Sequence, residues 1–282
     1  TDDVGQHNVA IGRDTLSALN IATAANTYNT AVGSKAGENV TTGIENTLIG
    51  GIAGDALTDA DYNVAIGVGA LGADTLGSRN TAIGKGSLQT QNFTTATDSY
   101  NVGVGFAAGN AVTTAIYNTL IGGLAGDHIT TGNSNTLMGY NAGTAINTGT
   151  ENTAFGRNAL ATDTKGDNSV AIGYQALNTQ NFTTNTDAYN VAVGYNAGVA
   201  VTTGVENTLI GGIAGDALTD ADYNVAVGVG ALGADTKGNR SVAVGKGSLQ
   251  TQNFTTSTDT YNVAVGYSAG VAVTTGQYNT FV

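Results

Sequence analysis

Apolar and polar positions recur along this chain with a short, nearly constant period. One pattern, Asn-(Thr/Val)-(Ala/Leu)-(Ile/Val)-Gly-x-x-Ala, returns throughout the sequence, and its glycines are 17 or 21 residues apart. We call these the anchor glycines: Gly12, Gly33, Gly50, Gly67, Gly84, Gly105, Gly122, Gly139, Gly156, Gly173, Gly194, Gly211, Gly228, Gly245 and Gly266. Because branched residues dominate the apolar positions and Gly and Asn punctuate each copy, every copy predicts one short strand followed by turns.

The length of the unit decides the fold class. Seventeen residues are too few for a two-helix repeat or a propeller blade. A short strand with turns, repeated at this length, predicts an all-β parallel β-solenoid in which each copy forms one coil. We expect about 15 coils of 17 or 21 residues in a single array over residues 1–282, and the near-identity of residues 45–98 and 206–259 adds a higher-order duplication.

The alternation within each strand predicts which side chains face inward. With the anchor glycine counted as position 0, position −1 is always aliphatic or large and apolar, as in Ile11, Val32 and Phe155. We expect positions −1 and −3 to face the coil interior and position −2 to face outward.

Position −2 is apolar as well, so both faces of the predicted strand need cover. It holds Ala in most copies, Leu in four and Gly103 in one. The cover is either a second sheet of the same coil or another chain, and the small coil favours another chain. Leu at −2 always accompanies Gly at +4, as in Leu48 with Gly54, and Leu at +4 accompanies Ala at −2, which indicates a packing site with room for one Leu.

The four coils without either Leu each follow a 21-residue spacing. Their long segments carry Ile21, Phe93, Phe182 and Phe254 at one equivalent place. We expect these side chains to fold inward and fill the volume that the missing Leu leaves. The alternative is that the three phenylalanines lie at exposed loop tips and contact a receptor.

Position −4 is Asn in nearly every copy, with Ser169 and Ser241 as exceptions. Stacked, in-register Asn side chains form amide ladders, and Asn suits the turn that enters a strand. We therefore predict a structural ladder that includes Asn46, Asn63, Asn80, Asn101, Asn118, Asn135 and Asn152.

Two further columns carry candidate binding chemistry. All tyrosines fall at −5 or +1, where they pack along an edge or, alternatively, stack on glycans. Acidic residues gather in the segment from +5 to +12, at Asp55, Asp59, Asp61, Asp216, Asp220 and Asp222. Their spacing matches neither an EF-hand loop nor a Gly- and Asp-rich nonapeptide, so we expect a solvated edge and no metal. Asp59, Asp61, Asp220 and Asp222 are candidate receptor contacts because loops carry most sequence variation.

Composition and charge narrow the possible functions. The chain has 42 Gly, no Pro, Cys or Trp, and a net charge of −12, which argues against nucleic acid and anionic membranes as partners. No apolar stretch approaches the ~20 residues of a membrane helix, so no membrane insertion is expected. The two histidines, His7 and His128, are far apart, which argues against a histidine zinc site and against general base catalysis.

Motifs for cofactors are coincidental here. Residues 67–72 and 228–233 match G-x-G-x-x-G, but each match is one phase of the coil repeat and no helical period follows. We predict that the chain binds no cofactor and is not an enzyme.

Residues 169–173 (Ser-Val-Ala-Ile-Gly) and 241–245 (Ser-Val-Ala-Val-Gly) resemble the core repeat of trimeric autotransporter adhesin heads. Residues 80–84 and 170–177 are similar to arrays in phage tail-fibre proteins, particularly marine ones. The resemblance covers nearly all of the chain, although the adhesin coils are somewhat shorter. It implies left-handed β-rolls packed side by side as a homotrimer.

These observations predict an extracellular, structural fibre segment that supports attachment to a host-cell receptor or glycan, on a phage tail fibre or similar appendage. The alternative is a bacterial adhesin head at the outer cell surface that binds host matrix or glycans. A remote third possibility is an ice-binding solenoid, although the outward Thr residues are irregular.

Overall fold

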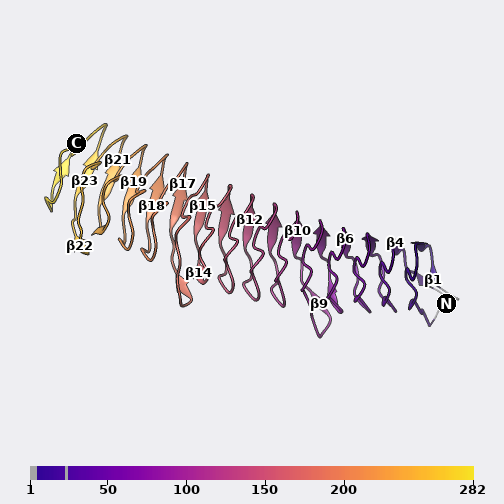
Figure 1. Ribbon diagram of the computed structural model, residues 1–282. Coiled ribbons are helices and arrows are strands. Elements are labelled where there is room, and N and C mark those ends of the chain that lie inside the picture. The colour runs from indigo at the N-terminus through magenta and orange to yellow at the C-terminus, as the bar shows by residue number, and fades with distance from the viewer. Residues whose placement is uncertain (1–4, 23–24) are drawn as a thin grey trace. The chain divides into compact units, whose positions relative to one another are not determined.

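A computed structural model describes residues 5–22 and 25–282, and these residues form strands and turns without any helix. The chain divides into two compact units, residues 1–135 and 136–282. Each unit is a stack of coils with one main strand per coil, as Figure 1 shows. The fold is therefore an all-β parallel β-solenoid of about 16 turns, as predicted.

The main strands occupy positions −3 to −1 of each coil. In the first unit they are β2 (Val9–Ile11), β4 (Thr30–Val32), β5 (Thr47–Ile49), β6 (Val64–Ile66), β8 (Thr81–Ile83), β10 (Val102–Val104) and β11 (Thr119–Ile121). In the second unit they are β12 (Thr136–Met138), β13 (Thr153–Phe155), β15 (Val170–Ile172), β17 (Val191–Val193), β18 (Thr208–Ile210), β19 (Val225–Val227), β21 (Val242–Val244), β23 (Val263–Val265) and β24 (Thr280–Phe281).

Short second strands appear beside the long segments. They pair in parallel as β1 (Gly5–Gln6) with β3 (Ala25–Asn26), β7 (Gly77–Ser78) with β9 (Thr97–Asp98), β14 (Gly166–Asp167) with β16 (Thr186–Asp187), and β20 (Gly238–Asn239) with β22 (Thr258–Asp259). The main ladder keeps its phase across the long coils, since Thr81 pairs with Val102 just as Thr47 pairs with Val64. The extra residues are therefore looped out of the main sheet, and the loop beside β9 projects beyond its neighbours (Figure 1).

Left-handed backbone conformations turn the chain at every coil. The anchor glycines have φ values such as +135° at Gly50, and a Cβ there would lie 2.7 Å from the carbonyl carbon and oxygen of Gly67 in the next coil. Only Gly combines this dihedral angle with such a close approach. Non-glycine residues also adopt positive φ at −5 and +4, as in Tyr62 (60°) and Leu71 (52°), where the regular coil imposes it.

The predicted direction of the strand side chains is wrong. Position −2 faces the interior: Leu48 and Ala65 are fully buried, while Ile172 at −1 is 38% exposed and Phe155 at −1 is 49% exposed. Alternation requires positions −3 and −1 to share the outer face. The interior of a 17-residue coil is narrow, so Ala or one Leu fits there and columns of Ile, Met and Phe do not.

Three interior positions, −2, +4 and +7, share one packing space. Leu209 at −2 accompanies Gly215 at +4 and Leu218 at +7, whereas Leu232 at +4 accompanies the buried Asp235 at +7. A Cβ on Gly215 would lie 2.7 Å from Leu209 Cδ2 and 2.8 Å from Leu218 Cδ1. The exchange of Leu and Gly seen in the sequence thus reflects a real volume limit, and it extends to a third position.

In coils that follow a long segment, leucine side chains of the two adjacent coils fill the interior beside the Gly at +4. At Gly198, a Cβ would lie 2.7 Å from Leu209 Cδ1 and 3.0 Å from Leu177 Cδ2, which belong to the coils on either side. Leu88 and Leu120 flank Gly109 in the same way. These flanking leucines, rather than the phenylalanines, are the side chains nearest to the space left by the missing Leu.

Candidate functional site

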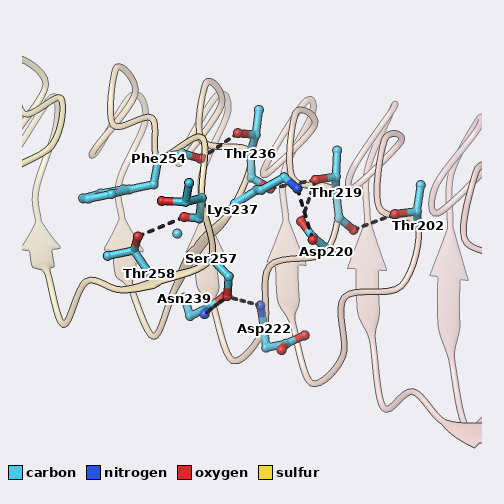
Figure 2. Close-up of polar contacts among 12 residues, drawn as sticks. Thr202, Thr219, Asp220, Asp222, Thr236, Lys237, Asn239, Phe254, Ser257 and Thr258 are labelled. Carbon is cyan, nitrogen blue, oxygen red and sulfur yellow. Dashed lines mark hydrogen bonds and ion pairs between the residues drawn. The ribbon is translucent and has the colours of Figure 1, made fainter.

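Asp220 and Asp222 of the second unit lie in one coil, and Figure 2 shows them beside Lys237 and Asn239 of the next coil. Asp220 Oδ2 is 3.3 Å from Lys237 Nζ, and Thr219 Oγ1 donates to Asp220 Oδ1 at 3.0 Å. Asp222 Oδ1 accepts the main-chain N–H of Val205 at 2.8 Å, while its own N–H donates to Asn239 Oδ1 at 2.9 Å. Each carboxylate is thus used to connect neighbouring coils.

The first unit has a similar arrangement with several different partners. Asp61 Oδ1 accepts the N–H of Ile44 at 2.8 Å, as Asp222 does with Val205. Asp59 accepts a hydrogen bond from the Thr42 hydroxyl, and Leu76 stands where Lys237 pairs with Asp220. Within residues 5–22 and 25–282, no three His or acidic side chains converge as a metal site would require.

The titration of these acids follows from their surroundings. Burial raises the pKa of Asp61 and of Asp222, against the opposing effect of the hydrogen bond that each accepts from the main chain. Burial alone would also raise the pKa of Asp220, but hydrogen bonds from Thr219 and Lys237 hold that pKa below its ordinary value.

The Asn residues at −4 are buried and joined from coil to coil. The side-chain oxygen of Asn29 accepts the main-chain N–H of Asn46 at 2.9 Å and its side-chain amide at 3.2 Å. The Asn46 amide also donates to the Ala60 carbonyl, at 2.8 Å, within its own coil. Asn63, Asn80, Asn101, Asn118 and Asn135 continue these bonds in the first unit, and Asn152 binds Ser169 N–H and the Gly166 carbonyl in the second.

Sequence reasoning missed a buried polar network beneath the three long loops that carry Phe93, Phe182 and Phe254. Asp235 Oδ2 accepts from Gln252 Nε2 at 2.5 Å, and Asp235 Oδ1 accepts the N–H groups of Gly238 and Phe254 at 3.0 Å each. Gln252 Oε1 then accepts from Asn262 Nδ2 at 2.8 Å. Asp235 and Gln252 are both fully buried.

The same network recurs at Asp74 with Gln91 and at Asp163 with Gln180, again at 2.5 Å. The two Ser residues at −4 take part in it, because Gln180 and Gln252 also donate to Ser169 and Ser241, at 2.9 Å and 2.8 Å. The sequence carries a signal for it: Asp and then Gln occupy +7 in consecutive coils that have Leu at +4.

The three phenylalanines of the long loops are each 6% exposed. Phe182 lies against Gly166 in the preceding coil, where an added Cβ would be 2.9 Å from Phe182 Cδ2. The main-chain N–H of each phenylalanine binds the buried Asp beneath it, and the Phe254 carbonyl accepts from the Thr236 hydroxyl at 2.7 Å (Figure 2). The rings cover the polar network and hold the base of the loop, while Thr94, Thr183 and Thr255 beside them are exposed.

Three pairs of tyrosines stack on one another, the third being Tyr261 with Tyr278. Tyr100 and Tyr117 have ring centroids 5.9 Å apart with planes at 20°, and Tyr174 and Tyr195 are 5.5 Å apart at 10°. Because a sugar ring stacks on an aromatic face, these mutually covered rings do not form a stacking platform.

Threonine hydroxyls at +8 are also used inside the chain. Thr202 donates to the Thr219 carbonyl at 3.2 Å, and the single Thr219 O–H is shared between the Thr236 carbonyl and Asp220 Oδ1, each 3.0 Å away (Figure 2). These hydroxyl groups are therefore hydrogen-bonded within the chain. This column therefore offers no regular array of free hydroxyl groups of the kind an ice-binding face uses.

The search for related proteins found no matching family model, curated protein or solved structure. The described residues contain no helix that could span a membrane. Their surface has no pocket.

Proposed function

We propose that this chain is a structural segment of an extracellular fibre, of the phage tail-fibre kind, in which three copies pack side by side and support attachment to a host surface. The observation that carries the proposal is the outer face of the main sheet in each unit. There, positions −3 and −1 present Val, Thr, Ile, Met and Phe to solvent and no charged residue in any copy.

A face of this kind calls for a partner. Parallel sheets are normally covered on both faces, and large contiguous apolar patches on a protein surface mark interaction sites. The interior side of this sheet is covered by its own coils, and the outer side is bare. A closed assembly of identical chains covers that side without leaving an open edge.

A second copy of the same chain is the occupant that best fits this face. The exposed side chains repeat once per coil, at the ~4.8 Å spacing of paired strands. A copy aligned in parallel presents its own column with the same spacing, so that the two columns interdigitate along their length. No charged residue occupies position −3 or −1, so a contact between the two columns places no charged side chain in its centre.

Sedimentation of the purified chain tests the assembly. We expect a trimer of 3 × 28.0 = 84 kDa at micromolar concentration. The double variant Ile172→Asp/Ile210→Asp places charges on the outer face and should dissociate it, whereas Thr203→Asp, on an exposed loop, should not. A folded wild-type chain that sediments as a 28 kDa monomer would refute the proposal.

The location of the fibre needs a separate experiment. Antibodies raised against the recombinant chain should label tail fibres of phage particles in immunogold electron microscopy. Label on the outer surface of bacterial cells would instead support the adhesin head, which the resemblance of residues 169–173 and 241–245 also allows.

A further inference from the structure

At position −5, tyrosine and arginine residues follow one another from coil to coil in the same order in both units. At position −5 the first unit carries Tyr62, Arg79, Tyr100 and Tyr117 in consecutive coils, and the second carries Tyr223, Arg240, Tyr261 and Tyr278. We call each set a tyrosine–arginine ladder. All eight residues have positive φ, which turns their side chains out at the same corner of the coil.

The contacts within the two ladders agree closely. The guanidinium carbon of Arg79 lies 4.5 Å from the centroid of Tyr62 and 5.9 Å from that of Tyr100, and Arg240 lies 4.6 Å from Tyr223. Tyr261 stacks on Tyr278 at 5.5 Å, as Tyr100 does on Tyr117. The planar groups therefore lie one above another, and Tyr62, Tyr100 and Tyr117 are 38%, 48% and 54% exposed.

A carboxylate from the projecting loop stands beside each arginine. Arg79 Nε is 3.0 Å from Asp98 Oδ2, and Arg240 Nε is 3.2 Å from Asp259 Oδ1. The arginine side chains remain 40% and 42% exposed, and the aspartates 51% and 46%. Donors of the guanidinium and acceptors of the carboxylate are thus available together at one point of the column.

We propose that each tyrosine–arginine ladder binds an extended, neutral, linear glycan that runs along the solenoid axis. The ladder presents phenol, guanidinium, phenol and phenol groups at successive coils, ~4.8 Å apart. An extended β-linked polysaccharide offers hydroxyl groups at a similar interval, each able to donate and accept a hydrogen bond. Recognition occurs through these groups and the adjacent carboxylate, without ring stacking.

The charges around the ladder select a neutral ligand. Asp61 interacts electrostatically with both Arg79 and Asp98. Asp222 interacts in the same way with Arg240 and Asp259. One arginine among two acids does not attract a polyanion, and the chain as a whole carries −12. A neutral polyol uses both the donors and the acceptors.

The long loop between the two ladders supplies an internal comparison. It has Asn168 in place of the arginine, and Asn168 Nδ2 binds Asp187 Oδ1 at 2.9 Å. The flanking −5 positions there are Glu151 and Glu206, with Tyr189 as the one aromatic residue. This loop has the same base and the same projecting segment but lacks the ladder, so we expect it not to contribute to binding.

Isothermal titration calorimetry of the full chain with cellohexaose, xylohexaose and chitohexaose tests the inference. We expect at least one of these extended oligosaccharides to bind, and maltohexaose, which coils, and alginate, which is anionic, to bind more weakly. The variant Arg79→Ala/Arg240→Ala should weaken binding about tenfold, the loss expected when hydrogen bonds to a charged group are removed. Lys85→Ala/Lys246→Ala is the matched control, because it removes the same charge from the same two coils at position +1.

Three results would overturn the inference: none of the extended oligosaccharides binds at millimolar concentration, the arginine and lysine variants lose affinity equally, or alginate binds most tightly. The biological role of glycan binding rests on the proposed fibre function, but the glycan proposal and the fibre proposal can be refuted by different experiments. Each ladder lies within one chain, so glycan binding is measurable whether or not the chain forms a trimer. A trimer without glycan binding leaves the fibre proposal intact, and a glycan-binding monomer removes the fibre proposal alone.

Discussion

The buried pair Asp235 and Gln252 gives the sharpest test of how these coils are held together. In Asp235→Asn, Oδ1 still accepts the N–H groups of Gly238 and Phe254, but the new amide Nδ2 faces Gln252 Nε2 across 2.5 Å. Two donors then oppose each other. Rotating the Gln252 amide moves the conflict to Asn262, whose Nδ2 lies 2.8 Å from Gln252 Oε1.

The magnitude follows from these contacts. The substitution removes a hydrogen bond to a charged acceptor, worth ~1.5–3 kcal/mol, and leaves a buried donor unsatisfied, at a cost of ~1–3 kcal/mol. We therefore expect Asp235→Asn to lower the free energy of unfolding by about 3 kcal/mol or more. Gln252→Glu alone should destabilise as well, because it places two carboxylates together in the interior.

Exchanging the two functional groups should restore the pair. In Asp235→Asn/Gln252→Glu the amide of residue 235 donates to the new carboxylate, which also accepts from Asn262, and the net charge equals that of the wild type. We expect the double variant to recover at least half of the summed losses, which makes the coupling energy in a double-mutant cycle large and favourable.

Urea denaturation at pH 7, followed by circular dichroism, measures all four members of the cycle. Asp220→Asn, which removes an exposed carboxylate paired with Lys237, is the control and should change stability by less than about 1 kcal/mol. If Asp235→Asn costs no more than this control, or if the double variant is as unstable as the two single losses added together, the network does not act as described.

Two further predictions concern the loops. Phe254→Ala should lower the free energy of unfolding by about 3–5 kcal/mol, because it empties a buried site above Asp235. Phe106→Ala, at an exposed position, is the control and should lower it far less. Unchanged stability of Phe254→Ala combined with weaker attachment to cells would make the phenylalanine a receptor contact. Burial raises the pKa of Asp222, so between the unfolded and folded pKa values the folded state binds more protons, and the stability contributed by this group falls as pH rises through that window. Asp222→Asn keeps the acceptor for Val205 N–H and should remove this pH dependence. The melting temperature of the variant should therefore increase relative to that of the wild type as pH rises from about 4 to 7. A constant difference between the two melting temperatures would contradict the assignment.

Sequence alone determined the architecture, because the repeat leaves little choice. A 17-residue period with one branched apolar strand and an invariant glycine is too short for anything but a single coil. The exchange of Leu48 with Gly54 was also readable, since a volume limit shared by two positions appears directly as their covariation along the chain. The Asn column followed from the stacking of identical residues in register.

The direction of the strand required the tertiary structure. Alternation states that −1 and −3 share a face and that −2 takes the other, but it is symmetric between inside and outside, and here both faces are apolar. Side-chain size decides between the two faces: the narrow coil accepts Ala65 or Leu48 in its interior and leaves Ile172 and Phe155 outside. A preference for the larger apolar residue as the buried one therefore gave the wrong face.

The polar interior was likewise decided by three-dimensional proximity. Asp235 and Gln252 come from adjacent coils, and as single residues each resembles a surface position. Their burial becomes favourable because the long segment brings the Phe254 N–H and the Gln252 amide to a carboxylate that already accepts the Gly238 N–H of its own coil. A buried charge is tolerated only where such donors converge, and convergence is a property of the folded coil that a linear pattern does not contain.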